Sequence, residues 1–83
     1  MRNFLIITGG AGFVGSNLIK HLIVKTKYKL ISIDNYSTGL KKNHVVNKRV
    51  RYIKGDTNKI YEILKPYKKK IHTIFHFGEY ARI

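Results

Sequence analysis

The 83-residue sequence has no cysteine and few acidic side chains, with 4 Asp and Glu against 17 Lys and Arg. Without cysteine, neither a disulfide nor a thiolate zinc site can brace the fold. The apolar runs are also short, and the first, at residues 4–7, is far shorter than a signal-peptide core or a membrane span. We therefore expect one small, soluble domain of marginal stability, suited to the reducing cytoplasm.

The excess of basic side chains gives a net charge of +13. Such a charge is typical of proteins that bind nucleic acid or an anionic membrane surface. However, the lysines are spread along the chain, and arginine, the residue favoured for reading bases, is much rarer. The run Lys68-Lys69-Lys70 is predicted to be a solvated loop. Nucleic-acid binding is therefore the less favoured interpretation, and the charge can instead attract an anionic cofactor.

Apolar runs of strand length predict four β-strands, at residues 4–7, 29–33, 50–53 and 72–77. After the first run, Val14, Leu18 and Leu22 recur every four residues, which predicts a helix over residues 12–25. Strands that alternate with helices favour a parallel sheet with right-handed crossovers. The expected fold class is therefore α/β.

A second, shorter helix is predicted after the third strand, with an apolar face around Ile60. Asp56 or Thr57 is a suitable N-cap for it. Pro66 should stop it, because proline cannot continue the helical hydrogen bonds. The polar stretch at residues 34–48 has no clean period and is expected to be a loop with at most one helical turn.

Four glycines fall within the seven residues 9–15, shortly after the first predicted strand. Three of them, Gly10, Gly12 and Gly15, have the G-x-G-x-x-G spacing. The first N–H groups of a helix have no partner inside it and, with the helix dipole, attract an anion. In such a turn the first glycine permits the tight bend, the second lets a pyrophosphate approach, and the third allows close packing of helix and strand. The spacing therefore predicts a dinucleotide site.

An acidic residue stands where a dinucleotide site requires one. Asp34 ends the second predicted strand, about 20 residues after the turn, where a carboxylate binds the ribose 2′-OH. Because a carboxylate repels the 2′-phosphate of NADP, NAD is the expected cofactor. A phosphate-binding P-loop is excluded, since Ser16 and Asn17 follow Gly15 where Lys and Ser or Thr are needed. The alternative is a structural glycine turn with an ordinary aspartate at the strand end.

Four segments resemble the extended short-chain dehydrogenases/reductases. Residues 8–15 resemble the T-G-x-x-G-x-x-G turn of that family, and "DNYSTG" (34–39) its segment after the second strand. Gly55-Asp56 resembles the family's G-D after the third strand, and residues 74–83 occupy the place of its cofactor-lining fourth strand, with Gly78-Glu79 instead of two alanines. Together they are similar to NAD-dependent epimerases/dehydratases, in particular those like UDP-glucose 4-epimerase.

The resemblance implies the N-terminal half of a Rossmann fold, with strand order 3-2-1-4 and NAD across the carboxyl ends of the strands. The cofactor-binding residues that it implies are Gly9, Gly10, Gly12, Phe13, Val14, Gly15, Asp34, Asn35, Ser37, Thr38, Gly39, Asp56, Thr57, Phe77 and Gly78. The implied reaction is hydride transfer between a nucleotide sugar and bound NAD.

The family's catalytic Y-x-x-x-K spacing occurs at Tyr61 and Lys65. We do not assign it, because in the family the motif lies on a later helix, well beyond the fourth strand. His72 and His76 would lie about 13 Å apart on a strand, too far to share a metal ion. We expect His76 to be buried and hydrogen-bonded, His21 and His44 to be surface residues, and no metal site.

Residues 1–83 are therefore expected to be a partial NAD-binding domain, without catalytic residues, a substrate domain or the second half of the sheet. A nucleotide sugar would bind only if a C-terminal part completed the enzyme. The exposed fourth strand predicts self-association or pairing with a complementary fragment. No membrane partner is expected. The alternative function is a non-catalytic, basic module that binds a dinucleotide or nucleic acid.

Overall fold

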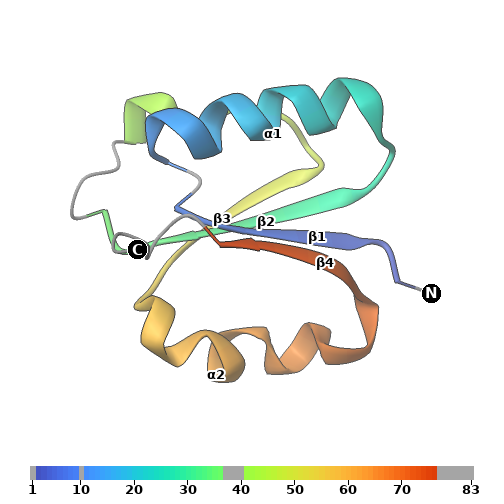
Figure 1. Ribbon diagram of the computed structural model, residues 1–83, viewed down its shortest axis with the longest axis vertical. Helices are drawn as coiled ribbons and strands as arrows, with labels where there is room; N and C mark the ends of the chain where they lie inside the picture. The colour runs from blue at the N-terminus through green and yellow to red at the C-terminus, as the bar shows by residue number, and fades with distance from the viewer. Residues whose placement is uncertain (1, 10, 37–40, 77–83) are drawn as a thin grey trace.

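The computed structural model describes residues 2–9, 11–36 and 41–76, which form one parallel sheet with helices on both faces (Figure 1). The strands are β1 (Phe4–Thr8), β2 (Lys29–Asp34), β3 (Val50–Lys54) and β4 (Ile71–His76). All pairings are parallel, and the order across the sheet is β3-β2-β1-β4. The predicted α/β class and the strand order 3-2-1-4 are therefore confirmed.

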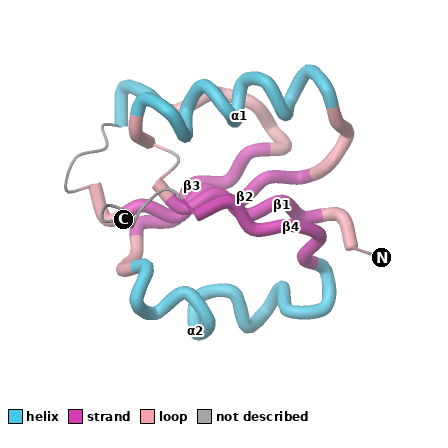
Figure 2. Tube along the Cα trace, in the orientation of Figure 1, coloured by secondary structure: helices cyan, strands magenta, loops and turns pink. Residues whose placement is uncertain are grey.

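The two faces of the sheet are covered unequally. Helix α1 (Phe13–Lys25) lies along one face, as Figure 2 shows, and it matches the prediction to within one residue. The other face is covered by the short helix α2 (Ile60–Leu64), which is flanked by the 3₁₀ segments η2 (Thr57–Lys59) and η3 (Lys65–Lys70). A further 3₁₀ turn, η1 (Lys41–Asn43), is the single turn expected in the polar loop.

The prediction of a loop at Lys68-Lys69-Lys70 is wrong, because these residues end the 3₁₀ segment η3. Pro66 lies in the first positions of that segment. A proline there loses no hydrogen bond that the segment needs, and its fixed φ suits a helical start. The α-helix ends at Leu64 as expected, but the chain stays helical.

Alternation along the strands divides the core in two. Ile6, Ile31 and Ile33 are buried together with Ile60 and Leu64 of α2. Leu5, Ile7 and Leu30 are buried on the opposite face against Ile19 of α1. Because β1 and β2 are covered on both faces, nearly every residue in them is buried and most are apolar, as their apolar runs predict.

The fourth strand differs from the two central ones. It pairs with β1 alone among the described strands, and a shift of register interrupts that pairing between Phe4 and Leu5. His76, predicted to be buried, is exposed, although a hydrogen bond of 3.3 Å joins its Nδ1 to Thr8 Oγ1. The position of β4 at the margin of the described sheet agrees with the predicted order, and the exposure of His76 is the difference from the prediction.

No helix in the part of the chain that the structure describes is long and apolar enough to cross a membrane. The carboxyl ends of the four parallel strands meet at one end of the sheet, the end at which α1 begins (Figure 1). That end is where polar side chains and the glycine turn come together.

Candidate cofactor-binding site

The chain turns sharply between β1 and α1. Gly9 has a φ of 77°, a left-handed conformation that favours glycine. Its N–H donates a hydrogen bond of 2.7 Å to the Ile33 carbonyl of β2, and its own carbonyl accepts one of 3.1 Å from the N–H of Gly12. The tight bend was assigned to Gly10, which lies outside the described residues; the positive φ that the structure records is at Gly9.

The turn leads directly into the N-terminus of α1. Gly12 is the N-cap of α1, and no side chain caps this end among the described residues. The first helical hydrogen bond, of 2.9 Å, runs from the N–H of Ser16 to the carbonyl of Gly12. Phe13 and Val14 are 81% and 59% exposed. N–H groups of the first turn, which have no helical partner, therefore face an end of the helix that an anion can reach.

Gly12 is not required by the conformation of the protein. Its φ of −83° and ψ of 176° are extended values that any residue adopts. A Cβ added there would meet the carbonyl oxygen of Gly9 at 3.4 Å, which is close to ordinary van der Waals contact. In a Rossmann turn, a glycine at this position lets the backbone approach a pyrophosphate, which a Cβ would obstruct.

Asp34, at the end of β2, accepts a hydrogen bond from the backbone of this turn. Its carboxyl group is buried, with 7% of the residue exposed. Oδ2 accepts a hydrogen bond of 3.1 Å from the N–H of Ala11, and Oδ1 accepts one of 2.7 Å from the N–H of Tyr36. A carboxylate offers about four acceptor positions. Asp34 can therefore hold the turn and still accept hydrogen bonds from ribose hydroxyls.

A second side chain that the sequence did not single out also holds the turn. Asn43 of η1 donates a hydrogen bond of 2.9 Å from Nδ2 to the carbonyl of Ala11. Ala11 is fully buried, and Asp34 and Asn43 engage its N–H and its carbonyl. The surrounding polar stretch lacks periodicity, so nothing in the sequence could distinguish Asn43 from its neighbours.

Tyr36, His44 and Tyr52 form an aromatic cluster beside Asp34. Tyr36 has a φ of 62°, and a hydrogen bond of 2.6 Å joins its hydroxyl to His44 Nε2. His44, expected to be a surface residue, is half-buried and stacks on Tyr52 of β3, with 3.7 Å between ring centroids. Burial, followed by the charges of Asp34 and Tyr52, raises the pKa of Tyr36. Tyr36 and His44 are thus packed against each other next to the proposed ribose contact.

The structure describes only some of the remaining predicted cofactor-binding residues. Asp56 follows β3 and is exposed; its Oδ1 accepts a hydrogen bond of 2.9 Å from the N–H of Asn58. It therefore caps the 3₁₀ segment η2, whereas the N-cap of α2 is Lys59. Asn35 is exposed beside Asp34, and Gly15 is buried on α1. The predicted contacts that lie outside the described residues are Gly10, Ser37, Thr38, Gly39, Phe77, Gly78 and the side chain of Thr57.

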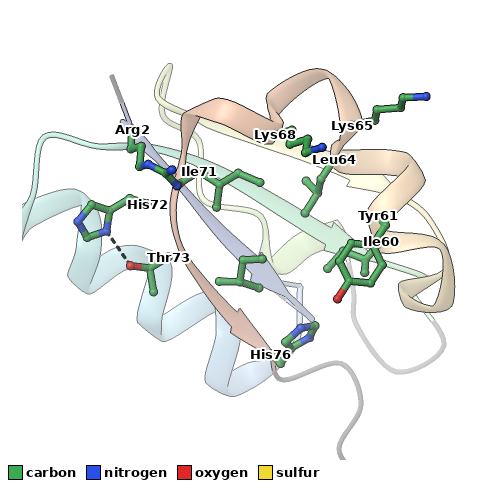
Figure 3. Close-up of a pocket in the computed structure, with 11 residues that line it drawn as sticks. Arg2, Ile60, Tyr61, Leu64, Lys65, Lys68, Ile71, His72, Thr73 and His76 are labelled. Atoms are coloured by element: carbon green, nitrogen blue, oxygen red, sulfur yellow. Dashed lines mark hydrogen bonds between the residues drawn. The ribbon is translucent and has the colours of Figure 1, made fainter.

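The residues that we did not assign as catalytic or metal-binding lie on α2, directly after it, and on β4 (Figure 3). Tyr61 is 88% exposed on α2 and Lys65 is exposed at its end, on the face of the sheet opposite α1. His72 and His76 are both on strand β4, as expected. Within residues 2–9, 11–36 and 41–76, no group of three or more His, Cys, Asp or Glu side chains is placed to hold a metal ion.

Proteins with this strand order, and with a glycine turn between the first strand and its helix, form the Rossmann class, which binds dinucleotides at the carboxyl ends of the strands. The described sheet is the first half of such a fold. The model of the NAD dependent epimerase/dehydratase family matches residues 5–83. The chain belongs to that family.

Individual proteins of known structure or name agree with this assignment. UDP-glucuronic acid decarboxylase 1 of Arabidopsis thaliana is 37% identical over 77 residues, covering 89% of this chain. The epimerase Mth375 of Methanothermobacter thermautotrophicus superposes with a TM-score of 0.81 at 28% identity, over 95% of this chain. The Bordetella bronchiseptica enzyme WbmF, solved with NAD+, superposes with a TM-score of 0.82 at 29% identity, also over 95% of this chain.

The chain is much shorter than these proteins. It spans 16% of the length of the Arabidopsis decarboxylase. It covers 23% of the Mth375 chain and 24% of the WbmF chain. The similarity therefore covers one segment of each relative.

Proposed function

We propose that this chain is the NAD-binding part of a nucleotide-sugar epimerase or dehydratase. The observation that carries the proposal is the open N-terminus of α1 at Gly12, next to the buried carboxylate of Asp34. These two features supply a phosphate site and a ribose acceptor on adjacent strands. The solved complex of WbmF with NAD+ supports the choice of dinucleotide.

Each group has a separate task in this proposal. The N–H groups of the first turn of α1 bind the pyrophosphate, and Asp34 accepts hydrogen bonds from the adenosine ribose. Asn43 keeps the peptide of Ala11 in position between them. When bound, NAD supplies the hydride acceptor for oxidation of a sugar hydroxyl. The buried negative charge of Asp34 disfavours a 2′-phosphate, so NAD is selected over NADP.

The catalytic part of the reaction is not assigned to residues of this chain. The relatives that it resembles are about four to six times longer, and a structure of UDP-glucose 4-epimerase from Thermotoga maritima contains UDP-glucose. We propose that a nucleotide sugar is the substrate of the completed enzyme. Residues that bind the sugar and transfer its proton would then come from polypeptide beyond the part described.

Isothermal titration calorimetry with NAD and NADP tests the proposal. The wild-type chain should bind NAD more tightly, and Asp34→Asn should reduce that preference about tenfold or more, because the charge facing the 2′-phosphate is lost. Glu62→Gln is the matched control, since it removes one negative charge from an exposed position on α2, away from the glycine turn. Unfolding by urea should be measured in parallel, because Asp34 also accepts two backbone N–H groups.

Two results would contradict this function. One is equal affinity for NAD and NADP in the wild-type chain. The other is binding of a DNA or RNA oligonucleotide more tightly than NAD, with an affinity that falls steeply with salt, as phosphate neutralisation requires. That second result would favour the basic nucleic-acid-binding module.

A further inference from the structure

Tyr36 has an uncommon backbone conformation for a bulky residue. Its φ is 62°, and no other non-glycine residue within residues 2–9, 11–36 and 41–76 has a positive φ. A side chain crowds the backbone in this left-handed region, so residues other than glycine, asparagine and aspartate seldom adopt it. Such a conformation persists where surrounding contacts hold it, and it is frequent at ligand-binding sites. The contacts of Tyr36 therefore bear on function.

Tyr36 is held at both its backbone and its side chain. Its N–H donates a hydrogen bond of 2.7 Å to Oδ1 of Asp34, and a hydrogen bond of 2.6 Å joins its hydroxyl to Nε2 of His44. The rings of Tyr36 and His44 also lie against each other, with 5.7 Å between their centroids. A change of φ turns the side chain relative to the N–H, so relaxation of φ would strain or break one of these two bonds.

His44, which anchors the ring of Tyr36, is itself attached to the sheet. It stacks on Tyr52 of β3, with 3.7 Å between ring centroids and 6° between ring planes. The hydroxyl of Tyr52 accepts a hydrogen bond of 2.7 Å from the N–H of Val45, the residue after His44. All three rings are half-buried. The anchor of Tyr36 is therefore built on a strand of the sheet and not on the loop alone.

The carboxyl group of Asp34 is consequently held from two sides. Oδ1 accepts the N–H of Tyr36, and Oδ2 accepts the N–H of Ala11 in the glycine turn, at 3.1 Å. Rotation of the carboxyl group about its bond to Cβ would give up both hydrogen bonds. The plane of the carboxylate is thus fixed before a ligand arrives, and its remaining acceptor positions point in set directions.

We propose that Tyr36, anchored by His44, is a positioning residue of the cofactor site. Its strained backbone directs an N–H to Asp34, and this hydrogen bond keeps the carboxylate facing the ribose. The inference rests on the NAD-binding function proposed above. A carboxylate that could turn or withdraw would bind the ribose 2′-OH less well, and it would also repel a 2′-phosphate less. Tyr36 and His44 therefore strengthen the preference for NAD over NADP.

Tyr36→Phe tests the anchor, because it removes the hydroxyl and keeps the ring. Calorimetry should show that NAD binds about threefold or more weakly and that the preference for NAD over NADP falls by a similar factor. Tyr67→Phe is the matched control. Tyr67 is also half-buried, and its hydroxyl accepts a hydrogen bond of 3.4 Å from Arg51, but it packs on the opposite face of the sheet from Tyr52. Its loss should leave both affinities within about twofold.

Replacement of Tyr36 by glycine or by alanine separates a backbone role from a side-chain role. Both changes remove the ring, but glycine adopts a φ of 62° without strain and alanine does not. Tyr36→Gly should therefore keep a larger preference for NAD than Tyr36→Ala. A tyrosine that only packed in the loop, or whose ring touched the cofactor, would give the two variants the same preference. Urea unfolding of both variants measures what each change costs the fold.

Hydrogen exchange of the free chain gives a readout that does not involve NAD. His44→Ala should speed exchange of the amide at position 36, because the anchor is gone. Unchanged exchange would overturn the inference, and so would faster exchange with an unchanged preference for NAD, which would make the cluster purely structural. Equal preferences of Tyr36→Gly and Tyr36→Ala would also overturn it. These three results leave the proposed function standing, whereas a wild-type chain that does not distinguish NAD from NADP would overturn both.

Discussion

At the scale of single residues, we attribute the glycine at position 12 to cofactor binding and not to a requirement of the fold. Its backbone angles suit any residue, and a Cβ would meet one neighbouring oxygen at 3.4 Å. We therefore expect Gly12→Ala to change the free energy of unfolding by less than about 1 kcal/mol. The same Cβ lies where the pyrophosphate should approach, so NAD affinity should fall about tenfold or more. Calorimetry and urea unfolding of the same preparation measure both effects.

Gly12→Val is a stricter version of this test, because its branched side chain fills more of the same space. If either variant bound NAD as tightly as the wild-type chain, the phosphate would not lie on this turn. If Gly12→Ala failed to fold, the glycine would be a structural requirement, and the separation between fold and cofactor proposed here would be wrong.

Residues could be predicted from the sequence where their spacing reflects a geometric requirement. Asp34 and Gly12 could be placed beside the turn because the turn and the strand end impose fixed positions. Asn43 could not, because its partner Ala11 lies 32 residues away and only the fold brings them together. The stacking of His44 was not predicted for the same reason, since its partner Tyr52 belongs to a strand.

At the scale of elements, the side chain of Arg49 links the start of β3 to the end of α1 and to the connection between α1 and β2. Arg49, before β3, donates from Nη1 to the carbonyls of Thr26 and Tyr28, at 2.9 Å each, and from Nη2 to the carbonyl of Ile23. It thereby satisfies carbonyls at and just after the C-terminal end of α1, where a positive charge also suits the helix dipole. Replacing it should loosen the connection between α1 and β2.

We expect Arg49→Met to lower the free energy of unfolding by about 1.5–3 kcal/mol, the range for hydrogen bonds to a charged group. Arg49→Lys should recover only part of this loss, because an ammonium lacks the planar fork that reaches several carbonyls. Arg51→Met is the control: Arg51 is exposed, with a single hydrogen bond of 3.4 Å to the Tyr67 hydroxyl. Its loss should cost less than about 0.5 kcal/mol in urea unfolding. Equal effects of both methionine variants would contradict this account.

Elements were predictable where burial is symmetric. The runs that form β1 and β2 are apolar because helices cover both faces, and α1 has a clear four-residue period. The place of β4 at the end of the described sheet was also predicted, whereas the exposure of His76 on that strand was not. The segment after Pro66 was also misassigned, since proline stops an α-helix but is compatible with the start of a 3₁₀ segment.

At the scale of the whole molecule, two properties bear on function: the family to which the chain belongs and its net charge. The chain belongs to the NAD dependent epimerase/dehydratase family, and it matches one segment of longer relatives. The net charge of +13 favours approach of the anionic cofactor and predicts binding that weakens with salt. Because any anion would show the same salt dependence, the location of binding is the decisive observation.

The most direct test is a titration of the ¹⁵N-labelled chain with NAD, followed by NMR through the backbone amide shifts. The proposed site predicts that the largest changes fall on the amides of Phe13, Val14 and Gly15, which begin α1, and on those of Asp34 and Tyr36. Amides of the lysine-rich segment at residues 65–70 should change little. If saturating NAD left the amides at the start of α1 unchanged while that segment shifted, the cofactor would be held by charge alone and the glycine turn would not be its binding site.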